Sequence, residues 1–472
     1  MNLPSAPYLS LLSSLTPQTI YLVGGSIRDL LAGKQDIKDI DLLMPSGSED
    51  VARKFADAIK GSFFVLDDER RITRVIKQED GDVLQFDFAN FEGPDLAADL
   101  GRRDFTMNAM ALDLRQGLER GSFEGLHDPF GGQEDIKKKL VRVTRPGVLD
   151  EDPLRLIRAI RFAAVLGFAI DDETAKQIRL RSRLITTPSP ERVRDELFLI
   201  LGEGNAEQNL MLLESLGLLA SLLPELDPLR GFAPGRYHVH DVLTHSIKTA
   251  GFLESVLEDL QLISPVHGPV VRAHLDEILE HFVSRKAALR FACLIHDNAK
   301  PETFSNADNH VRFHGHDNIG AEKAVSICRR FKLSRDTEKA VTRVIKQHMR
   351  LFNLATPGGP SRNAVYRYCR DMGDALPESL LLAQADARAT SEIMPKEKFT
   401  DTTKPMATVL EYYYTKFLKT EASPLVNGQD LIDRGFIPGP RFKEILEEVK
   451  ERQAEGILRD RDEALAYLGK LG

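Results

Sequence analysis

Two carboxylates, Asp39 and Asp41, stand one residue apart in the apolar stretch DIDLL, which has the pattern of a β-strand. Alternate side chains of a strand share one face, so both carboxylates should point the same way. Two carboxylates are unfavourable in a hydrophobic core but form a good binding site for Mg²⁺. Two bound metal ions can support an in-line displacement at a phosphate. Taken alone, such a pair is explained equally well by an edge strand that is exposed to solvent.

A glycine pair, Gly24-Gly25, follows the apolar stretch IYLV and is followed in turn by Arg28-Asp29. Glycine lets another backbone approach closely, and amides at the start of a helix could hold a triphosphate. The alternative is an ordinary turn between a strand and a helix. The three features GG, RD and DxD within one short stretch are much more specific than any one of them, and together they favour a catalytic phosphate site.

The elements that position these residues alternate in type up to about residue 145. Apolar strands are expected at 20–23, 40–43, 63–66 and 83–88, with helical stretches between them, which predicts an α/β head. From about 150 the pattern is helical. A Pro/Gly-rich break at 224–238 then leads into a second helical region, from 236 to about 400, which holds every histidine except His127.

Bulk composition bounds the class of protein. The chain has 472 residues, 42% hydrophobic and 28% charged, as expected for a globular protein of about three domains. No apolar run is long enough to span a bilayer, and the N-terminus lacks the features of a signal peptide. Three cysteines without CxxC spacing fit free thiols in the cytoplasm, our expected location. The net charge of −8 predicts no general affinity for nucleic acid.

Several segments in order carry a resemblance to one family. GGSIRD and DIDL resemble the head of the class II tRNA nucleotidyltransferase and bacterial poly(A) polymerase family, as do RRDFTMNAMA at 102–111, DPFGG at 128–132, EDPLRLIRAIRF at 151–162 and ERVRDEL at 191–197. The resemblance covers nearly the whole chain. It implies an α/β nucleotidyltransferase head followed by an all-α body, an all-α HD domain and a helical tail. We place these parts at 1–145 (catalytic head), 146–228 (helical neck with the nucleotide-selecting helix), 229–400 (HD-type domain) and 401–472 (tail).

The resemblance also implies roles for individual residues. Asp39 and Asp41 would be catalytic and hold two Mg²⁺ ions. Asp104 would accept a hydrogen bond from the ribose, although the RRD stretch alone would suggest only a surface charge cluster. Asp87 is either a third acidic group near the metals or an ordinary strand residue. The remaining nucleotide contacts in the head would be Gly24, Gly25 and Arg28 at the triphosphate, and Arg103 and Asn108 at the incoming nucleotide.

The stretch EDPLRLIR predicts how a base is chosen. Pro153 suits a first helical position, which puts Asp152 near the N-cap and Arg155 and Arg158 along one side of the helix. An Asp accepts from an exocyclic amino group and an Arg donates to ring acceptors. Asp152 with Arg155 would therefore accept C and A and reject U and G. The alternative is a capped helix with a weak ion pair.

A short link between the strand VLQFDFANF and Arg102 decides the expected product. In the family a long flexible segment there helps to reshape the pocket from C to A, and its loss resembles the CC-adding members. We therefore expect CTP-dependent addition of C residues to the tRNA 3′ end, with pyrophosphate released and a separate A-adding enzyme acting afterwards. The alternatives are a full CCA-adding enzyme that uses CTP and ATP, an A-adding enzyme, and a poly(A) polymerase.

The histidine-rich half resembles the HD phosphohydrolase superfamily. The matched ligands are His245, His296, Asp297 and Asp386, and His314, His316 and His348 could be additional ligands. Such ligands suit Ni²⁺, Mn²⁺ or Mg²⁺, and a metal-bound water could attack a phosphoester. Asn298 and Ala299 depart from the expected apolar residue and glycine. The domain therefore either retains a metal-dependent phosphatase or phosphodiesterase activity or serves as a tRNA-holding body. A different class of function also stays open, in which the HD domain is a metal phosphohydrolase and the head only binds RNA.

Overall fold

The computed structural model describes most of the chain, namely residues 6–34, 37–68, 71–79, 81–120, 122–233, 240–307, 310–391 and 400–471. These residues form two compact units. The first comprises 1–188 and 216–218, and the second comprises 189–215 and 219–472. Within the described ranges, every helix is too short or too polar to cross a membrane.

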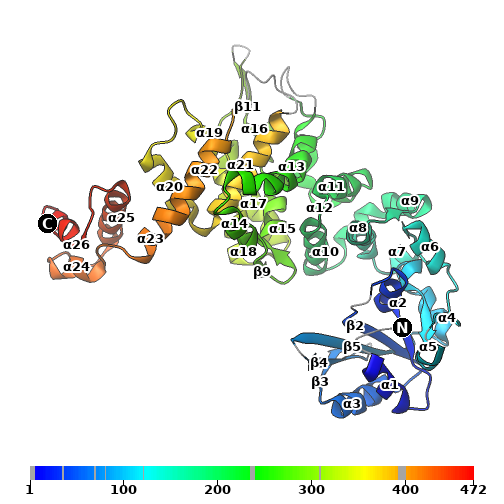
Figure 1. Cartoon of the computed structure of the whole chain (residues 1–472). Coiled ribbons are helices and arrows are strands. Elements are labelled where there is room, and N and C mark those ends of the chain that lie inside the picture. Colours follow the sequence, from blue (N-terminus) through cyan, green and yellow to red (C-terminus); the bar gives the residue numbers. More distant parts are fainter. Residues whose placement is uncertain are drawn as a thin grey trace. The chain divides into compact units, whose positions relative to one another are not determined.

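The first unit is built on a mixed six-stranded sheet with the order β3-β4-β5-β2-β1-β6. β1 pairs antiparallel with β2 and β6, and β2 pairs parallel with β5. β4 is antiparallel to both β3 and β5. The strands are β1 (Tyr21–Val23), β2 (Asp39–Met44), β3 (Ser62–Asp67), β4 (Ile72–Glu79), β5 (Asp82–Asn90) and β6 (Ala111–Asp113). The α/β head expected from the sequence is confirmed, and all four expected strands are present (Figure 1).

Helices pack on this sheet. α3 contacts β4 and β5, while α2 contacts β1, β2 and β6. Phe55 of α3 and Phe86 of β5 are fully buried and meet edge to face, 5.0 Å between ring centroids, which fixes α3 on the sheet. The helices of this part are α1 (Ala6–Ser14), α2 (Gly24–Leu31), α3 (Ser48–Ile59), α4 (Leu96–Gly101), the 3₁₀ turn η1 (Thr106–Asn108), α5 (Leu114–Arg120) and α6 (Gly132–Lys138).

The rest of the first unit is mainly helical. α8 has a buried face of Leu156, Ile157, Ile160 and Ala163 at helical spacing, and it ends at Gly167, which adopts the left-handed conformation. The elements are β7 (Leu140–Val141), α7 (Val148–Glu151), α8 (Arg155–Leu166), β8 (Ala169–Ile170), α9 (Asp172–Arg181) and η2 (Ser182–Thr186).

The second unit is almost entirely helical, as expected. Its centre is the contact of α13 with α21, against which α15 also packs. Every residue of α15 except Lys286 is buried, so this helix is the core of the unit. Its elements are α10 (Pro190–Gly202), α11 (Ala206–Ser215), α12 (Leu218–Leu222, whose first residue belongs to the first unit), η3 (Pro224–Leu229), α13 (Val242–Ile263), α14 (Gly268–Leu275), β9 (Ile278–Glu280), β10 (Val283–Ser284), α15 (Arg285–Ile295), α16 (Lys300–Thr303), β11 (Phe304–Ala307), β12 (His310–Phe313), α17 (His316–Arg330), α18 (Arg335–Gln347), α19 (Arg350–Leu354), α20 (Arg362–Met372), η4 (Gly373–Ala375), α21 (Leu376–Ser391) and α22 (Thr403–Tyr412).

The C-terminal segment has a small core of its own. Val426, Leu431, Ile445, Val449 and Leu468 form a buried cluster that does not include residues of the larger helical core. Its elements are the π-helical turn η6 (Tyr413–Phe417), α23 (Leu418–Ala422), α24 (Gly428–Asp433), α25 (Pro440–Glu455) and α26 (Arg461–Leu468). The helical tail is therefore present as expected, while the exact four-part division of the chain stays a prediction.

Candidate functional sites

The glycine pair brings the start of α2 onto the carboxylate strand. Gly24 has a positive φ of 66°, and a Cβ there would lie 2.8 Å from Asp41 Oδ2. The Gly25 amide donates to the same oxygen at 3.2 Å. Ser26, which sequence reasoning missed, ties the two elements together: its hydroxyl donates to the Asp39 carbonyl and accepts from the Asp41 amide. Only a residue without a side chain fits at Gly24.

Asp39 and Asp41 lie on one face of β2, as the alternation predicted, with Asp39 exposed and Asp41 partly buried. Burial raises the pKa of Asp41, while the nearby Arg103 guanidinium lowers it. Asp87 is opposite Asp41 on β5, but Arg74 holds both of its oxygens, at 2.7 and 2.8 Å. Asp87 is therefore ion-paired, and its charge also acts on Asp41, so it is an acidic group beside the Asp39–Asp41 pair.

Asp104 is the centre of a buried hydrogen-bond network. Its Oδ1 accepts from the Phe105 amide at 2.9 Å and from Asn108 at 3.0 Å, and its Oδ2 accepts from Arg158 Nε and Nη2 at 3.0 and 2.7 Å. The Asn108 carbonyl oxygen accepts in turn from Arg28 at 2.9 Å. Four donors thus surround Asp104, and a ribose hydroxyl at this carboxylate would have to share or replace one of them.

Phe162 underlies the same network, and sequence reasoning did not single it out. The guanidinium groups of Arg28 and Arg158 both lie 5.3 Å from its ring centroid, and Arg161 lies at 4.2 Å. Phe105 meets the ring edge-on at 5.6 Å. One aromatic ring therefore contacts three cations. The spacing Arg158-x-x-Arg161-Phe162 in EDPLRLIRAIRF was the available signal.

The predicted base-reading pair lies at the start of α8, with one correction. The helix begins at Arg155 and not at Pro153, and Asp152 caps a turn by accepting from the Leu154 amide at 3.2 Å. The Arg155 guanidinium donates to the carbonyls of Val148, at 3.0 Å, and Arg102, at 2.8 Å. Pro153 belongs to a short turn before the helix, because Leu154 supplies the N-cap. Asp152 and Arg155 still lie one turn apart, and the Asp152 charge acts on Arg155.

The residues of the first unit suit a divalent cation next to a phosphate. Two carboxylates on one strand face are the oxygen ligands that Mg²⁺ prefers. The Arg103 charge acts on Asp41, and Arg28 is linked to Arg158 through Asn108 and Asp104. A surface with ligands for a metal ion beside several guanidinium groups can hold a nucleoside triphosphate.

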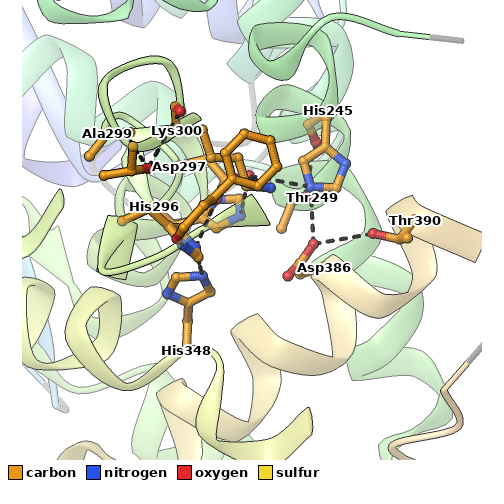
Figure 2. A network of polar contacts seen from close by, with 12 residues as sticks. His245, Thr249, His296, Asp297, Ala299, Lys300, His348, Asp386 and Thr390 are labelled. Atoms are coloured by element: carbon orange, nitrogen blue, oxygen red, sulfur yellow. Dashed lines mark hydrogen bonds and ion pairs between the residues drawn. The ribbon is translucent and has the colours of Figure 1, made fainter. Parts of the chain in front are cut away.

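A second candidate site lies at the centre of the helical unit, where α13, α15, α18 and α21 meet (Figure 2). His245 Nε2 lies 3.0 Å from Asp386 Oδ1, and Asp297 Oδ2 lies 3.7 Å from His245 and 3.2 Å from His296. Two groups, His245/His296/Asp386 and His296/Asp297/His348, have ligand atoms close enough to share a metal ion. The structure thus brings together all four predicted HD residues and, of the possible additional ligands, His316 and His348.

Three of the imidazoles are held in the same way. The Nδ1 atoms of His296, His316 and His348 each lie at hydrogen-bond distance from the carbonyl three residues earlier, at 2.8, 2.8 and 2.6 Å. An Nδ1–H that donates to a carbonyl leaves Nε2 with its lone pair, which is the tautomer that binds metals. The Nε2 atoms of His316 and His348 face each other at 3.2 Å, which needs a proton or a cation between them.

The charged groups around Asp297 are also consistent with a metal site. Burial raises the pKa of Asp297, but His296 and Lys300 outweigh it and hold the pKa well below its usual range. Burial and the neighbouring His296 lower the pKa of His348 to about 4. Lys300 Nζ lies 2.6 Å from Asp297 Oδ2, a contact that sequence reasoning missed although the spacing of three residues could have shown it. Imidazole and carboxylate groups together are a fitting donor set for a divalent metal.

Orphaned polar atoms support that fit. Among the described residues, His296 Nε2 and both Asp297 oxygens are buried and make no hydrogen bond of good geometry, although Asp297 Oδ2 is ion-paired with Lys300 Nζ at 2.6 Å. Buried polar atoms normally have a partner, so these atoms are suited to a bound cation. His314 is exposed and outside the cluster, contrary to its place among the additional ligands. Asn298 is buried beside Gly320, whose carbonyl accepts from its amide at 3.3 Å, so its departure from the expected apolar type leaves the cluster intact.

Comparisons with known families follow the same order along the chain. Residues 20–142 match the poly A polymerase head domain, 167–230 match the probable RNA and SrmB-binding site of polymerase A, and 242–391 match the HD domain. Most residues of both candidate sites lie inside these matches. Asp152, Arg155 and Arg158 lie between the matched head domain and the matched RNA-binding segment.

Known relatives are similar over almost their full length. An A-adding tRNA nucleotidyltransferase of Deinococcus radiodurans is 33% identical over 463 residues, which is 96% of this chain and 95% of the relative. A CC-adding tRNA nucleotidyltransferase of Geobacter sulfurreducens is 29% identical over 473 residues, or 99% and 96% of the two chains.

Solved structures share the fold. The Thermotoga maritima CCA-adding enzyme complexed with tRNA has a TM-score of 0.63 at 20% identity, covering 99% of this chain and 95% of that one. A CCA-adding enzyme with CTP has a TM-score of 0.66 at 21% identity, covering 98% and 94%. Because the Deinococcus relative is 33% identical across both chains, this chain belongs to the tRNA nucleotidyltransferase family with a poly A polymerase head and an HD domain, and it is an enzyme of the nucleotidyltransferase class.

Proposed function

We propose that this enzyme adds C residues to the 3′ end of tRNA, using CTP and releasing pyrophosphate. The observation that carries the choice of C is the segment between β5 and Arg103. It is short, and its second half is the helix α4, capped by Asp95, which accepts from the Ala98 amide at 2.8 Å. A link of this kind leaves little freedom for a segment that must reshape the pocket from C to A.

The head supplies the chemistry of transfer. The tRNA 3′-hydroxyl attacks the α-phosphate of CTP, and pyrophosphate leaves in line. Mg²⁺ ions bound by Asp39 and Asp41 would lower the pKa of the attacking hydroxyl and stabilise the leaving oxygen. Arg28 and Arg103 bind the phosphates, and the Gly24-Gly25 backbone leaves room for them next to β2.

Base choice rests on Asp152 and Arg155. Cytosine and adenine both present an amino group beside a ring acceptor, which is complementary to a carboxylate beside a guanidinium. Uracil and guanine present the reverse pattern and leave both protein groups unpaired, a mismatch that costs far more than an absent contact. Asn108 and Asp104 hold the neighbouring Arg158 and Arg28 in place.

The identities to relatives support the family and not the nucleotide, since an A-adding and a CC-adding enzyme are similarly close. The A-adding activity is therefore the strongest alternative, followed by full CCA addition and by poly(A) synthesis. If the enzyme adds only C, a separate A-adding enzyme must complete the tRNA. We retain the cytoplasm as the expected compartment.

Three tRNA transcripts decide between these activities. One lacks CCA, one ends in C and one ends in CC, and each is incubated with Mg²⁺ and CTP, ATP or both, with products resolved at single nucleotides. Arrest after two C, with no A added to the CC transcript, is the expected result. Addition of a single A to the CC transcript, with CTP unused, would assign the A-adding activity. Completion to CCA or long A tails would assign the other two alternatives.

We also propose a second activity, a metal-dependent phosphohydrolase in the HD domain. Its support is the set of imidazole Nε2 atoms turned toward the buried Asp297. A metal held by His245, His296, Asp297 and Asp386 would supply an activated water for attack on a phosphoester. Lys300, which reaches Asp297 at 2.6 Å, orients that carboxylate.

Substitutions separate the two activities. Asp297→Asn should abolish metal binding in the HD site, measured as metal per chain after dialysis against Ni²⁺ or Mn²⁺, and should leave CTP addition unchanged. Asp41→Asn should do the reverse. If Asp297→Asn retains both the bound metal and hydrolysis of a phosphodiester such as bis-p-nitrophenyl phosphate, the HD assignment is wrong. If Asp41→Asn retains CTP addition, the head assignment is wrong.

A further inference from the structure

A third carboxylate lies on the same face of the sheet as the Asp39–Asp41 pair. The strands β2 and β5 are parallel, and Asp87 is the register partner of Asp41. Register partners on neighbouring strands project to the same face, and such strands lie about 4.8 Å apart. Burial is the main cause that raises the pKa of Asp41, and the charges of Asp87 and Asp39 add to it. Three carboxylates are therefore close together on this face.

Arg74 of β4 neutralises the third carboxylate. It is the register partner of Asp87, and its Nε and Nη2 donate to Asp87 Oδ1 and Oδ2 at 2.7 and 2.8 Å. A bidentate pair of this kind is held in a fixed geometry, so both Asp87 oxygens face Arg74. The hydrogen bonds to Asp87 raise the pKa of Arg74, and the charges of Asp39 and Asp41 also raise it. The guanidinium therefore acts on all three carboxylates.

The Arg74–Asp87 pair sets the charge that a metal ion meets on this face. Asp39, Asp41 and Asp87 carry three negative charges, of which Arg74 cancels one. Arg103, whose charge also acts on Asp41, is present in either case. The affinity of a carboxylate site for a hard cation rises with the number of charged ligands, and Mg²⁺ is commonly held by one or two carboxylates together with substrate phosphates. Two available carboxylates thus suit a metal ion that is completed by a triphosphate.

We propose that Arg74 is a positioning residue for the metal site of the head, which holds Asp87 away from the metal ion and keeps the affinity for free divalent cations low. The metal ion is then bound firmly only together with the nucleoside triphosphate, and it can leave with pyrophosphate after the transfer. Arg74 acts on the metal through Asp87. The inference rests on the proposed role of Asp39 and Asp41 as metal ligands, but it does not depend on which nucleotide is added.

Binding of Mn²⁺ to the nucleotide-free enzyme tests the direction of the effect. Free Mn²⁺ is followed by its electron paramagnetic resonance signal, and the head-site component is the one that Asp41→Asn removes. Arg74→Met should tighten this component about tenfold or more, because Asp87 becomes an unpaired carboxylate beside the ion. Asp87→Asn should weaken it about tenfold, because Arg74 becomes an unpaired cation there. The double variant should return to within about threefold of the wild type.

Two controls separate charge from shape. Arg74→Lys keeps the positive charge and should leave the Mn²⁺ affinity within about threefold of the wild type. Arg53→Met makes the same change of residue at an exposed guanidinium of α3 that pairs with Glu49, and it should leave the affinity within about twofold. Arg74 is 32% exposed, so a methionine is accommodated there. Thermal unfolding checks each variant, and Arg74→Gln tests the same loss of charge if Arg74→Met does not fold.

The outcomes separate this inference from the proposed function. Damage to the fold would weaken Mn²⁺ binding, so only a gain in affinity supports the role of Arg74. Unchanged or weaker binding in Arg74→Met, together with loss of binding in Asp41→Asn, would overturn the inference and leave the metal site in place. Mn²⁺ binding that Asp41→Asn leaves intact would refute the metal ligands of the proposed function, and this inference with them.

Discussion

Replacing Arg158 with Met should destabilise the first unit far more than the loss of an ordinary surface ion pair. Arg158 gives two hydrogen bonds to Asp104 Oδ2, at 3.0 and 2.7 Å, and Asp104 is only 7% exposed. Removing one partner of a buried pair leaves the other charge stranded, which costs about 3–5 kcal/mol. Asp104 keeps its bonds from Phe105 and Asn108, so we expect about 3 kcal/mol.

The assay is calorimetry of the full chain, with the two units followed as separate transitions where they resolve. For a unit of this size, about 3 kcal/mol corresponds to a fall of roughly 6–12 °C in the Tm of the first unit. The matched control is Arg181→Met, because Arg181 pairs with Asp150, which is 48% exposed, in the same unit. That control should cost about 1 kcal/mol or less.

A double-substitution cycle identifies the stranded charge as the cause. Adding Asp104→Asn to Arg158→Met removes the uncompensated carboxylate, so the double variant should be less destabilised than the sum of the single ones, by about 0.5–3 kcal/mol. Additive costs, or an Arg158→Met cost as small as that of Arg181→Met, would refute the reasoning. Either result would mean that Asp104 is hydrated in the folded protein.

The pH dependence of this cost has a defined sign. Burial raises the pKa of Asp104, but Arg158 and Asn108 outweigh it and hold the folded-state pKa below its ordinary value. A carboxyl with a lowered pKa contributes stability above its unfolded pKa and loses it as the pH falls through the folded pKa. Without Arg158 the burial of Asp104 is no longer outweighed, so its folded-state pKa in Arg158→Met lies above that of the wild type. The difference in stability between wild type and Arg158→Met should therefore shrink as the pH falls from the folded-state pKa of the variant to the lowered pKa of the wild type.

Three further substitutions test the head site. Asp41→Asn should lower kcat for nucleotide addition at least about 100-fold, because it removes a metal ligand at the reacting phosphate, while the Tm changes little. Gly24→Ala should lower kcat/KM about 10–100-fold, because the new Cβ would lie 2.8 Å from Asp41 Oδ2 at a φ of 66° and would displace that carboxylate. Phe162→Leu should cost about 1–2 kcal/mol of stability and raise the KM for CTP about three- to fivefold, because Arg28 and Arg158 lose the ring that holds them. Steady-state kinetics and thermal unfolding measure all three, and an unchanged KM in Phe162→Leu would contradict the role of the ring.

The sequence was sufficient for the α/β head, its strands and the shared face of Asp39 and Asp41, because strand alternation is a local property. It was also sufficient to suggest which histidines belong to the HD site. It could not show that Asp87 is held by Arg74, since that pairing depends on the register between β4 and β5. The exposure of His314 was equally hidden, because it depends on how the turn before α17 packs.

The start of α8 shows a different limit. Pro153 is a good first helical residue, but Pro153 and Leu154 form a turn before the helix. Asp152 caps this turn, and Arg155 donates to two carbonyls that are distant in sequence. Local preference was outweighed there by tertiary hydrogen bonds. The link between Arg155 and α4 could not be predicted, because its acceptor is a backbone carbonyl, which leaves no trace in residue type.

Four aspartates of this chain show how the surroundings of a carboxylate distinguish a candidate metal ligand from a structural support. Asp104 receives four N–H donors, which use its acceptor positions and leave little for a cation. Asp297 is fully buried beside His296 and His316, whose Nδ1 atoms lie at hydrogen-bond distance from backbone carbonyls. It therefore faces the Nε2 atoms of these imidazoles and the ammonium group of Lys300. Asp39 is exposed on the same strand face as Asp41. A carboxylate surrounded by donors supports the fold, whereas Asp297 beside imidazole Nε2 atoms and Asp39 on an exposed strand face retain acceptor positions that a metal ion could use, as the two proposed metal sites require.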